Sequence, residues 1–291
     1  GPLSGSGQIQ GLAESQYTAA RCRKALFRRG DKRTMVSMEH MDCTSLSSGQ
    51  ASWRSGLEVH QSKGSTDEGA GSLAGLHEAR KRHQGQFWTP LSVVSMLWRI
   101  AQEAFESQAD RKITLLDNSM GSGRMWHFAT ADRFALAGCD VDAELVAKVQ
   151  ETAEAAGFTV DLHARGMEEV APRGFDVALV NPPFSLSLQN PALKKYPCTT
   201  WGKFGPDTSA QSDEYAVCQA LEAAAVVLAV VPSGLAADVV AGGLIGEQRQ
   251  RLRAVLSLGK TAFSGEGAEV ETSVLVFGRD KGEYIGRISV D

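Results

Sequence analysis

The sequence predicts an α/β fold with a mostly parallel sheet, helices on both faces and a final antiparallel strand. Short apolar runs of strand length alternate with segments of helical spacing along most of the chain. A glycine-rich stretch, residues 118–124, follows the first of these runs, and two prolines, Pro182 and Pro183, end the fourth. Both features are typical of sheets whose strands end at a ligand site.

The expected elements follow from hydrophobic spacing and from turn residues. The last strand comes after a glycine-rich loop and is expected to insert antiparallel. The first helix should have Thr89 as its N-cap and Pro90 at its first helical position. Strands are expected at residues 113–117, 134–139, 158–163, 175–180, 226–231, 254–258 and 272–277. Helices are expected at residues 73–82 and 91–100, and near 123–131, 143–156, 211–224 and 243–253.

The amino-terminal quarter differs in character from the rest. Residues 1–7 look like the scar of a cleaved tag. Residues 8–72 contain a basic run and then a Ser/Gly-rich stretch, a composition that predicts a flexible or loosely packed arm. The basic run suits either phosphate contacts or, as we favour, a solvated arm. Residues 73–291 are expected to form the folded catalytic domain.

Composition excludes several classes of protein. The 291 residues are 43% hydrophobic and carry a formal net charge of -4, so no global basic field indicates a nucleic-acid partner. The five cysteines and six histidines show no metal-ligand spacing, which predicts neither a metal site nor a disulfide framework. Reduced thiols in a cytoplasm are the expectation. No apolar run approaches the roughly 20 residues that span a bilayer.

The most informative segment is Asn181-Pro182-Pro183-Phe184, which follows the apolar run at residues 175–180. Proline cannot extend a strand ladder, so the segment predicts a stiff tip at the carboxyl end of a buried strand. The Asn181 side chain and backbone carbonyls are acceptors, and Phe184 adds an aromatic face. This combination suits a planar base with an exocyclic amine. The alternative is a simple turn with Phe184 packed in the core.

A second motif begins at Asp117, where the first strand ends in an acid and runs into Gly121 and Gly123. Glycines there let a ligand approach the backbone closely. The loop has no lysine, so it does not match the phosphate-binding loop of nucleotide hydrolases. An acid beside glycines suits a cofactor with a cationic amine. Asp140, at the end of the second strand, suits ribose hydroxyls, and its alternative role is a helix N-cap.

These segments are expected to line one crevice. In a switch-point sheet the fourth strand lies next to the first, so Asn181 would end beside Asp117. Strand order alone therefore predicts that the acids, the glycines and the Asn-Pro-Pro-Phe tip share one edge of the sheet.

Together the motifs resemble those of S-adenosylmethionine-dependent N6-adenine DNA methyltransferases, in particular the modification subunits of type I restriction-modification systems. Residues 85–90, Gly-Gln-Phe-Trp-Thr-Pro, are similar to the segment that holds the methionine part of the cofactor in that family. The resemblance covers roughly residues 75–280 and implies a Rossmann-like methyltransferase sheet. It implies cofactor contacts from Phe87, Thr89, Pro90, Asp117, Gly121, Gly123 and Asp140.

The resemblance implies that Asn181, Pro182, Pro183 and Phe184 form the catalytic loop. Asn181 Oδ1 and the Pro182 carbonyl would accept the two hydrogens of the target amine, and Phe184 would stack on a flipped base. The implied partner is DNA, reached through a separate recognition domain or subunit, with no membrane and no metal.

Two departures from the family leave alternatives open. Met167 stands where the family commonly has an acid for the cofactor's adenine amine, so either the affinity is weak or Glu168 substitutes. No segment after about residue 280 is long enough to be a target-recognition domain. The alternatives are a methyltransferase acting on RNA or on a protein glutamine, and a catalytically silent cofactor-binding module.

The composition of residues 8–72 predicts that they are dispensable for the methyltransferase fold, because they can bury little apolar surface. A chain that starts at residue 73 should keep the thermal transition of the full chain, as measured by circular dichroism. An unfolded or aggregated product would show that the arm packs on the sheet.

Overall fold

The computed structural model describes residues 89–106, 110–171, 173–203, 205–242, 245–264 and 270–290. The expected tag scar, the arm at 8–72, the helix at 73–82 and the candidate cofactor residue Phe87 lie outside the described residues. Their predictions are therefore not tested by this structure.

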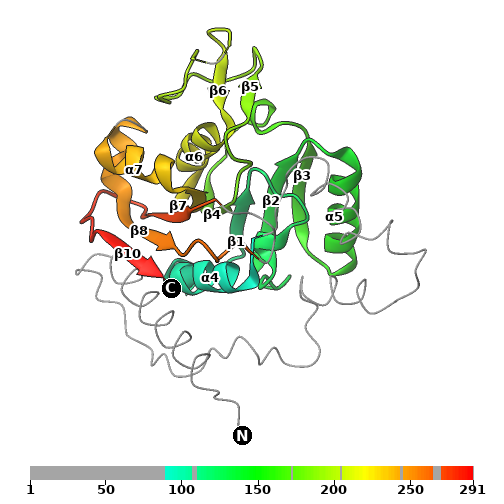
Figure 1. Ribbon diagram of the computed structural model, residues 1–291. Helices are drawn as coiled ribbons and strands as arrows, with labels where there is room; N and C mark the ends of the chain where they lie inside the picture. The colour runs from blue at the N-terminus through cyan, green and yellow to red at the C-terminus, as the bar shows by residue number, and fades with distance from the viewer. Residues whose placement is uncertain are drawn as a thin grey trace, which may run out of the picture.

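The described residues form an eight-stranded sheet in the order β10-β8-β9-β7-β4-β1-β2-β3. Only β9 runs antiparallel within it, between β7 and β8. All seven expected strands are present, so the predicted fold class is confirmed (Figure 1). The strands are β1 (Ile113–Asp117), β2 (Phe134–Asp140), β3 (Thr159–Ala164), β4 (Phe175–Val180), β7 (Ala224–Pro232), β8 (Leu252–Leu258), β9 (Thr272–Phe277) and β10 (Arg287–Val290).

Alternate side chains of the central strands pack into two separate hydrophobic cores, one on each face of the sheet. In β4, Val177 and Leu179 pack with α4 (Leu91–Glu106) and α5 (Ala143–Ala155) on one face of the sheet. Ala178 and Val180 pack with α6 (Ser212–Ala223) and α7 (Ser233–Ala241) on the other. Successive side chains of a strand point to opposite faces, so a continuous apolar run is what a sheet covered on both faces requires. Figure 1 shows α6 and α7 together on one side and α4 on the other.

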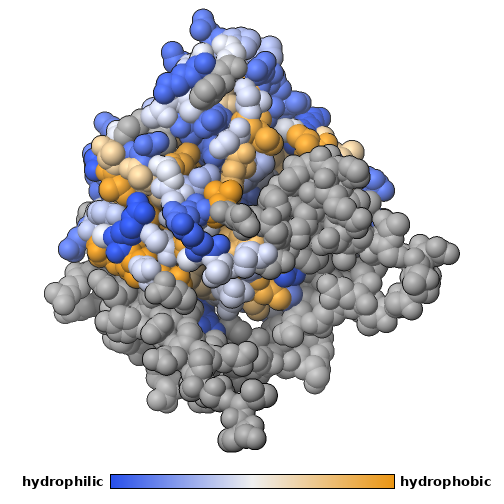
Figure 2. All heavy atoms as spheres, viewed as in Figure 1, coloured by the Kyte–Doolittle hydropathy of each residue, from blue (hydrophilic) through white to orange (hydrophobic). Residues whose placement is uncertain are grey.

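A two-stranded hairpin, β5 (Ser187–Gln189) and β6 (Ser209–Gln211), projects from the sheet above the end of β4 (Figure 1). Its connecting loop is fixed to α6. The Tyr215 hydroxyl accepts from the Lys194 backbone N–H at 3.1 Å, and buried Glu214 accepts from both the N–H and the hydroxyl of Thr200. Hydrophilic residues dominate the surface of the hairpin, while hydrophobic residues gather just below it (Figure 2).

The predictions of two α-helices are wrong. Around 123–131 the structure has only the 3-10 helix η2 (Arg124–Trp126), and within 243–253 it has the 3-10 helix η4 (Gly246–Arg251). Burial of Met125 and Trp126 in the core overrides helical spacing in the first case. In the second, Ile245 and Gly246 both adopt positive φ, 60° and 52°, which a right-handed α-helix does not tolerate.

Four of the described strands and α-helices were not expected from the sequence. The hairpin strands β5 and β6 have only three residues each and no apolar run. Helix α7 has only nine residues, fewer than the length at which helical spacing is clear. Strand β10 is a four-residue edge strand of alternating polar and apolar residues that pairs in parallel with β8.

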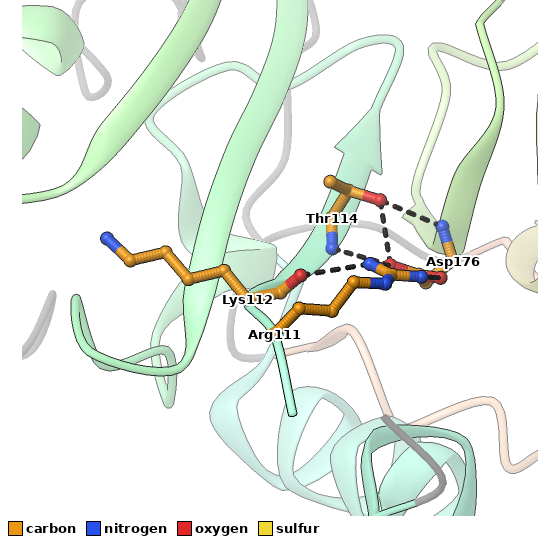
Figure 3. A network of polar contacts seen from close by, with 4 residues as sticks. All are labelled: Arg111, Lys112, Thr114 and Asp176. Carbon is orange, nitrogen blue, oxygen red and sulfur yellow. Dashed lines mark hydrogen bonds and ion pairs between the residues drawn. The ribbon is translucent and has the colours of Figure 1, made fainter. Parts of the chain in front are cut away.

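Near the amino-terminal ends of the central strands, β1 and β4 are joined by a polar network centred on Asp176 (Figure 3). Arg111 donates two hydrogen bonds to its carboxylate, at 2.8 and 2.6 Å, and Thr114 donates from its N–H and its hydroxyl, both at 2.9 Å. Burial alone would raise the pKa of Asp176, but the hydrogen bonds from Arg111 and Thr114 outweigh it and hold the pKa below its usual range.

Asp176→Asn should lower the free energy of unfolding at pH 7 by about 1–3 kcal/mol, because it weakens hydrogen bonds to a charged group. The folded-state pKa lies below the unfolded one, so this stabilisation is complete above the unfolded pKa of about 4. The difference between the two proteins should therefore shrink as the pH falls below about 4, which urea unfolding at several pH values measures.

The control is Asp161→Asn, which removes an exposed partner of Arg173. An exposed pair of this kind should contribute less than about 1 kcal/mol. Equal effects of the two substitutions, or an Asp176 effect that does not change with pH, would contradict this account.

Candidate functional site

A cleft of about 550 Å³ lies at the carboxyl edge of the sheet, where β1, β2, β3 and β4 end. Its walls come from three kinds of segment: the glycine-rich loop after β1, the ends of the neighbouring strands, and the Asn-Pro-Pro-Phe tip. Of the candidate residues, the lining includes Thr89, Asp117, Gly121, Asp140, Asn181, Pro182, Pro183 and Phe184. The sequence prediction of one shared crevice is therefore correct for these eight residues.

The other candidates are placed differently. Gly123 precedes η2 in the left-handed conformation, with φ 74°, and is not part of the lining. Pro90 is also outside the lining. Helix α4 begins at Leu91, and the Pro90 carbonyl accepts from Val94 N–H at 3.0 Å, so Pro90 precedes the helix. The expected position of Pro90 inside the first turn is wrong by one residue.

The loop after β1 brings its backbone to the cleft surface. Gly121 has φ 50°, and a Cβ added there would meet no atom within 4 Å. The position thus combines a conformation that favours glycine with open space above the backbone. Ser119 Oγ is buried in the same loop and has no hydrogen-bond partner within the described part of the chain. A ligand can therefore approach the backbone of this loop closely.

Asp140 holds the glycine loop. Its Oδ2 accepts from Gly121 N–H at 3.1 Å, and its Oδ1 accepts from Asp142 N–H at 3.0 Å. The N-cap of α5 is Asp142, whose side chain accepts from Leu145 N–H, so the alternative reading of Asp140 as the helix cap is wrong. A carboxylate offers about four acceptor positions, so Asp140 keeps acceptor capacity for a ligand in the cleft.

Asp117 is a buried acid beside this loop, only 1% exposed. Burial raises the pKa of Asp117 to about 7, a hydrogen bond from Ser119 N–H opposes the rise, and repulsion from Asp140 adds to it. Burial likewise raises the pKa of Asp140, against the hydrogen bonds from Asp142 and Gly121. Two neighbouring acids, one of them buried, favour a cationic ligand in the cleft.

Beyond β3, Met167 is among the residues that line the cleft, but its thioether accepts only weak hydrogen bonds. Its side chain is 7% exposed and packs in the core shared with α6. The next residue, Glu168, also lines the cleft and accepts from Asn190 at 3.3 Å. Its carboxylate lies against Gly166, where an added Cβ would fall 2.6 Å from Oε2. Of these two neighbours, Glu168 is the one with a strong acceptor.

A buried amide pair connects the glycine loop to the segment after β3. Asn118 Nδ2 donates to Gln219 Oε1 at 3.0 Å, and Gln219 Nε2 donates to the Met167 carbonyl. Both side chains are at most 5% exposed. Asn118 therefore ties the glycine loop through α6 to the segment after β3.

The Asn-Pro-Pro-Phe tip is held from both sides. Asn181 Nδ2 donates to Thr89 Oγ1 at 2.9 Å, and no hydrogen bond to Asn181 Oδ1 is found among the described residues. The Pro183 carbonyl accepts from the Ser212 hydroxyl at 2.6 Å, at the start of α6. Thr89 therefore contacts the catalytic candidate itself, a role that the sequence did not predict.

The backbone turns sharply just after the tip. Ser185 has φ 54°, an unusual value for a residue with a side chain, and its N–H donates to Asp213 at 3.1 Å. Burial raises the pKa of Asp213, partly offset by that hydrogen bond and one from Glu214. Phe184 is partly buried against the core and also lines the cleft, so it both packs and borders the site.

No sequence pattern indicated a further part of the lining, which comes from the start of the hairpin and from the segments before and at the start of β9. These residues are isolated in the sequence, and all but Thr272 are apolar. Thr272 is 1% exposed, and its hydroxyl has no partner in the parts of the chain that are described. This part of the lining consists of Leu186, Leu188, Phe263, Val270 and Thr272.

The described residues contain no cluster of three or more His, Cys, Asp or Glu side chains that could hold a metal ion. The described cysteines, Cys139, Cys198 and Cys218, are free thiols. No helix in the described part of the chain combines the length and apolar character that crossing a membrane requires.

No family model and no curated protein shows significant sequence similarity to the chain. Solved structures are similar in fold. A type I restriction-modification methyltransferase subunit from Streptococcus thermophilus matches 70% of this chain at 18% identity and a TM-score of 0.52. The chain spans 47% of that subunit. A second similar structure is a putative class I S-adenosylmethionine-dependent methyltransferase from Listeria monocytogenes, with 14% identity and a TM-score of 0.54. The match covers 81% of this chain and 75% of that protein. The chain therefore has the fold of class I methyltransferases.

The buried acids give a prediction that needs no ligand. Asp140→Asn should lower the pKa of Asp117 from about 7, because it removes the charge that repels the Asp117 carboxylate. Carbon-detected NMR titration of the Asp side chains measures this. Glu169→Gln, an exposed substitution outside the cleft, is the control and should leave the titration unchanged. An Asp117 pKa near 4 in the wild type would refute the assignment.

Proposed function

We propose that this protein binds S-adenosylmethionine in the cleft and transfers its methyl group to the exocyclic N6 amine of adenine in DNA. One observation carries the proposal: the Asn181 tip lines the same cleft as Asp117, Gly121 and Asp140. The class I methyltransferase fold and the sequence resemblance support the reaction type.

The residues present fit this cofactor. Gly121 leaves open space for a ligand against the backbone, and Asp140 has free acceptor positions for ribose hydroxyls. Asp117 faces the cleft as a buried acid, and a positively charged ligand beside it would favour its ionised form. Ser119 Oγ supplies a buried hydroxyl that lacks a partner in the described residues.

Recognition of the cofactor's adenine is assigned to Glu168 instead of Met167. The Met167 side chain is packed in the core, so Met167→Asp would bury a carboxylate in apolar surroundings and destabilise the protein. Glu168 is among the residues that line the cleft, and a carboxylate can accept from an exocyclic amine. The alternative of an unusually weak cofactor site therefore receives no support from this part of the cleft.

Bound S-adenosylmethionine would supply a sulfonium methyl group, which passes to the amine nitrogen while the C–S electron pair stays on sulfur and the surplus amine proton leaves to water. Asn181 Oδ1 and the Pro182 carbonyl would accept hydrogen bonds from the amine and align its lone pair for the attack. Phe184 would stack on the base. Orientation and electrostatic stabilisation in a poorly solvated cleft would supply most of the acceleration.

The target is expected to be DNA, reached with the help of a separate recognition domain or subunit. The type I restriction-modification subunit of similar fold favours DNA, and it is about twice as long as the matched part. RNA and protein glutamine are the competing substrates for an Asn-Pro-Pro-Phe tip. A catalytically silent cofactor-binding module is the competing class.

The proposed function predicts that substitutions in the Asn-Pro-Pro-Phe tip impair methyl transfer without weakening cofactor binding. Asn181→Ala should abolish methyl transfer, because it removes an acceptor for the amine, and Phe184→Ala should impair substrate engagement by about 1–3 kcal/mol. Both variants should bind S-adenosylmethionine within a few-fold of wild type. Titration calorimetry and tritium-methyl transfer to mixed DNA and RNA, followed by nucleoside analysis, measure both properties.

The matched variant is Asp140→Ala, which should show the opposite pattern. Loss of charged hydrogen bonds to the cofactor should weaken its binding by about 1.5–3 kcal/mol. Turnover that survives in Asn181→Ala would rule out the amino-methyltransferase mechanism. Methylated RNA without methylated DNA would change the substrate class, and cofactor binding without any turnover in the wild type would favour the silent module.

A further inference from the structure

Thr89 and Asn181 are brought together from distant parts of the chain. Thr89 Oγ1 accepts from Asn181 Nδ2 at 2.9 Å, although 92 residues separate them. Thr89 is only 2% exposed, so water competes little for this bond. The contact joins the segment before α4 to the tip of β4. Within the described residues it is the only hydrogen bond of the Asn181 side chain.

The orientation of the Asn181 amide decides its chemistry. An amide carries an acceptor oxygen and a donor nitrogen on the same carbon, and rotation by half a turn exchanges them. An amine that is to be methylated needs an acceptor, since two N–H groups facing each other cannot form a hydrogen bond. With Nδ2 engaged by Thr89, Oδ1 is the group that remains for a ligand in the cleft.

Thr89 is itself fixed by its neighbours. Arg124, which follows the glycine loop, donates from Nε to the Thr89 carbonyl at 3.3 Å. Helix α4 begins directly afterwards, with Val94 N–H bonded to the Pro90 carbonyl. The hydroxyl that holds Asn181 is therefore presented by backbone anchored to the cofactor side of the cleft.

We propose that Thr89 is a positioning residue that holds the Asn181 amide with its oxygen directed to the cleft. The inference rests on the proposed function and extends it, because it assigns the Thr89 hydroxyl to Asn181 and to turnover in place of the cofactor contact that the resemblance implies. Thr89 acts through Asn181: its hydroxyl holds the amide nitrogen, and the amide oxygen then meets the amine of the substrate.

The test compares Thr89→Val, which keeps the shape but removes the hydroxyl, with Thr89→Ser, which keeps the hydroxyl. The first readout is the side-chain amide pair of Asn181 in ¹⁵N NMR spectra of the full chain without ligand, assigned by its loss in Asn181→Ala. Wild type and Thr89→Ser should show a slowly exchanging, shifted amide proton. Thr89→Val should lose both properties.

The second readout is the division between turnover and binding. Thr89→Val should lower kcat for methyl transfer to DNA on the order of tenfold or more, with S-adenosylmethionine affinity within a few-fold of wild type. Thr89→Ser should restore kcat to within a few-fold. A merely structural role for Thr89 would not give this rescue together with an unchanged affinity.

Two results would overturn the inference: unchanged Asn181 amide signals in Thr89→Val, or a loss of cofactor affinity as large as the loss of turnover. A wild type that transfers no methyl group would instead contradict the proposed function. The amide spectra, recorded without ligand, would still decide whether Thr89 orients Asn181.

Discussion

The parallel pairing of β1 with β4 in the middle of the sheet is the constraint on which the site depends. Leu115 pairs with Val177 and Leu116 with Ala178, so both strands end at the same edge. Asp117 ends one strand, and Asn181 follows the other. A shift by one residue would turn the apolar side chains of β4 to the wrong faces, so burial on both faces also fixes the position of the tip.

Several polar groups are buried around this edge, and burying them costs free energy unless they contact a hydrogen-bond partner or a ligand. Asp117 is buried near a second acid, and its pKa rises to about 7 as a result. Ser119 and Thr272 keep buried hydroxyls without partners among the described residues. Unpaired buried polar groups are uncommon away from functional sites. Their gathering on one cleft, beside a backbone that Gly121 leaves accessible, is what a polar, cationic ligand would require.

The sequence was sufficient wherever a local pattern determined the structure. The apolar runs of β1, β2, β4 and β9 could be located because a strand buried on both faces is apolar throughout. The crevice formed by Asp117, Asp140 and Asn181 followed from strand order.

Features that depend on tertiary contacts could not be predicted. The bond between Thr89 and Asn181 joins residues 92 positions apart. Ile245 adopts a φ of 60°, which a β-branched residue disfavours, so no propensity would indicate that the expected helix stops there. The inward packing of Met167 and the outward position of Glu168 depend on how α6 fills the space behind β3.

The central claim is that one cleft holds the cofactor with its reactive end toward the Asn181 tip. A crystal structure of the full chain with S-adenosylhomocysteine tests this most directly. The account predicts ribose hydroxyls bonded to Asp140, the amino-acid part beside Asp117 and Gly121, and the thioether sulfur facing Asn181. Ligand bound elsewhere, or in this cleft with its sulfur directed away from Asn181, would contradict it.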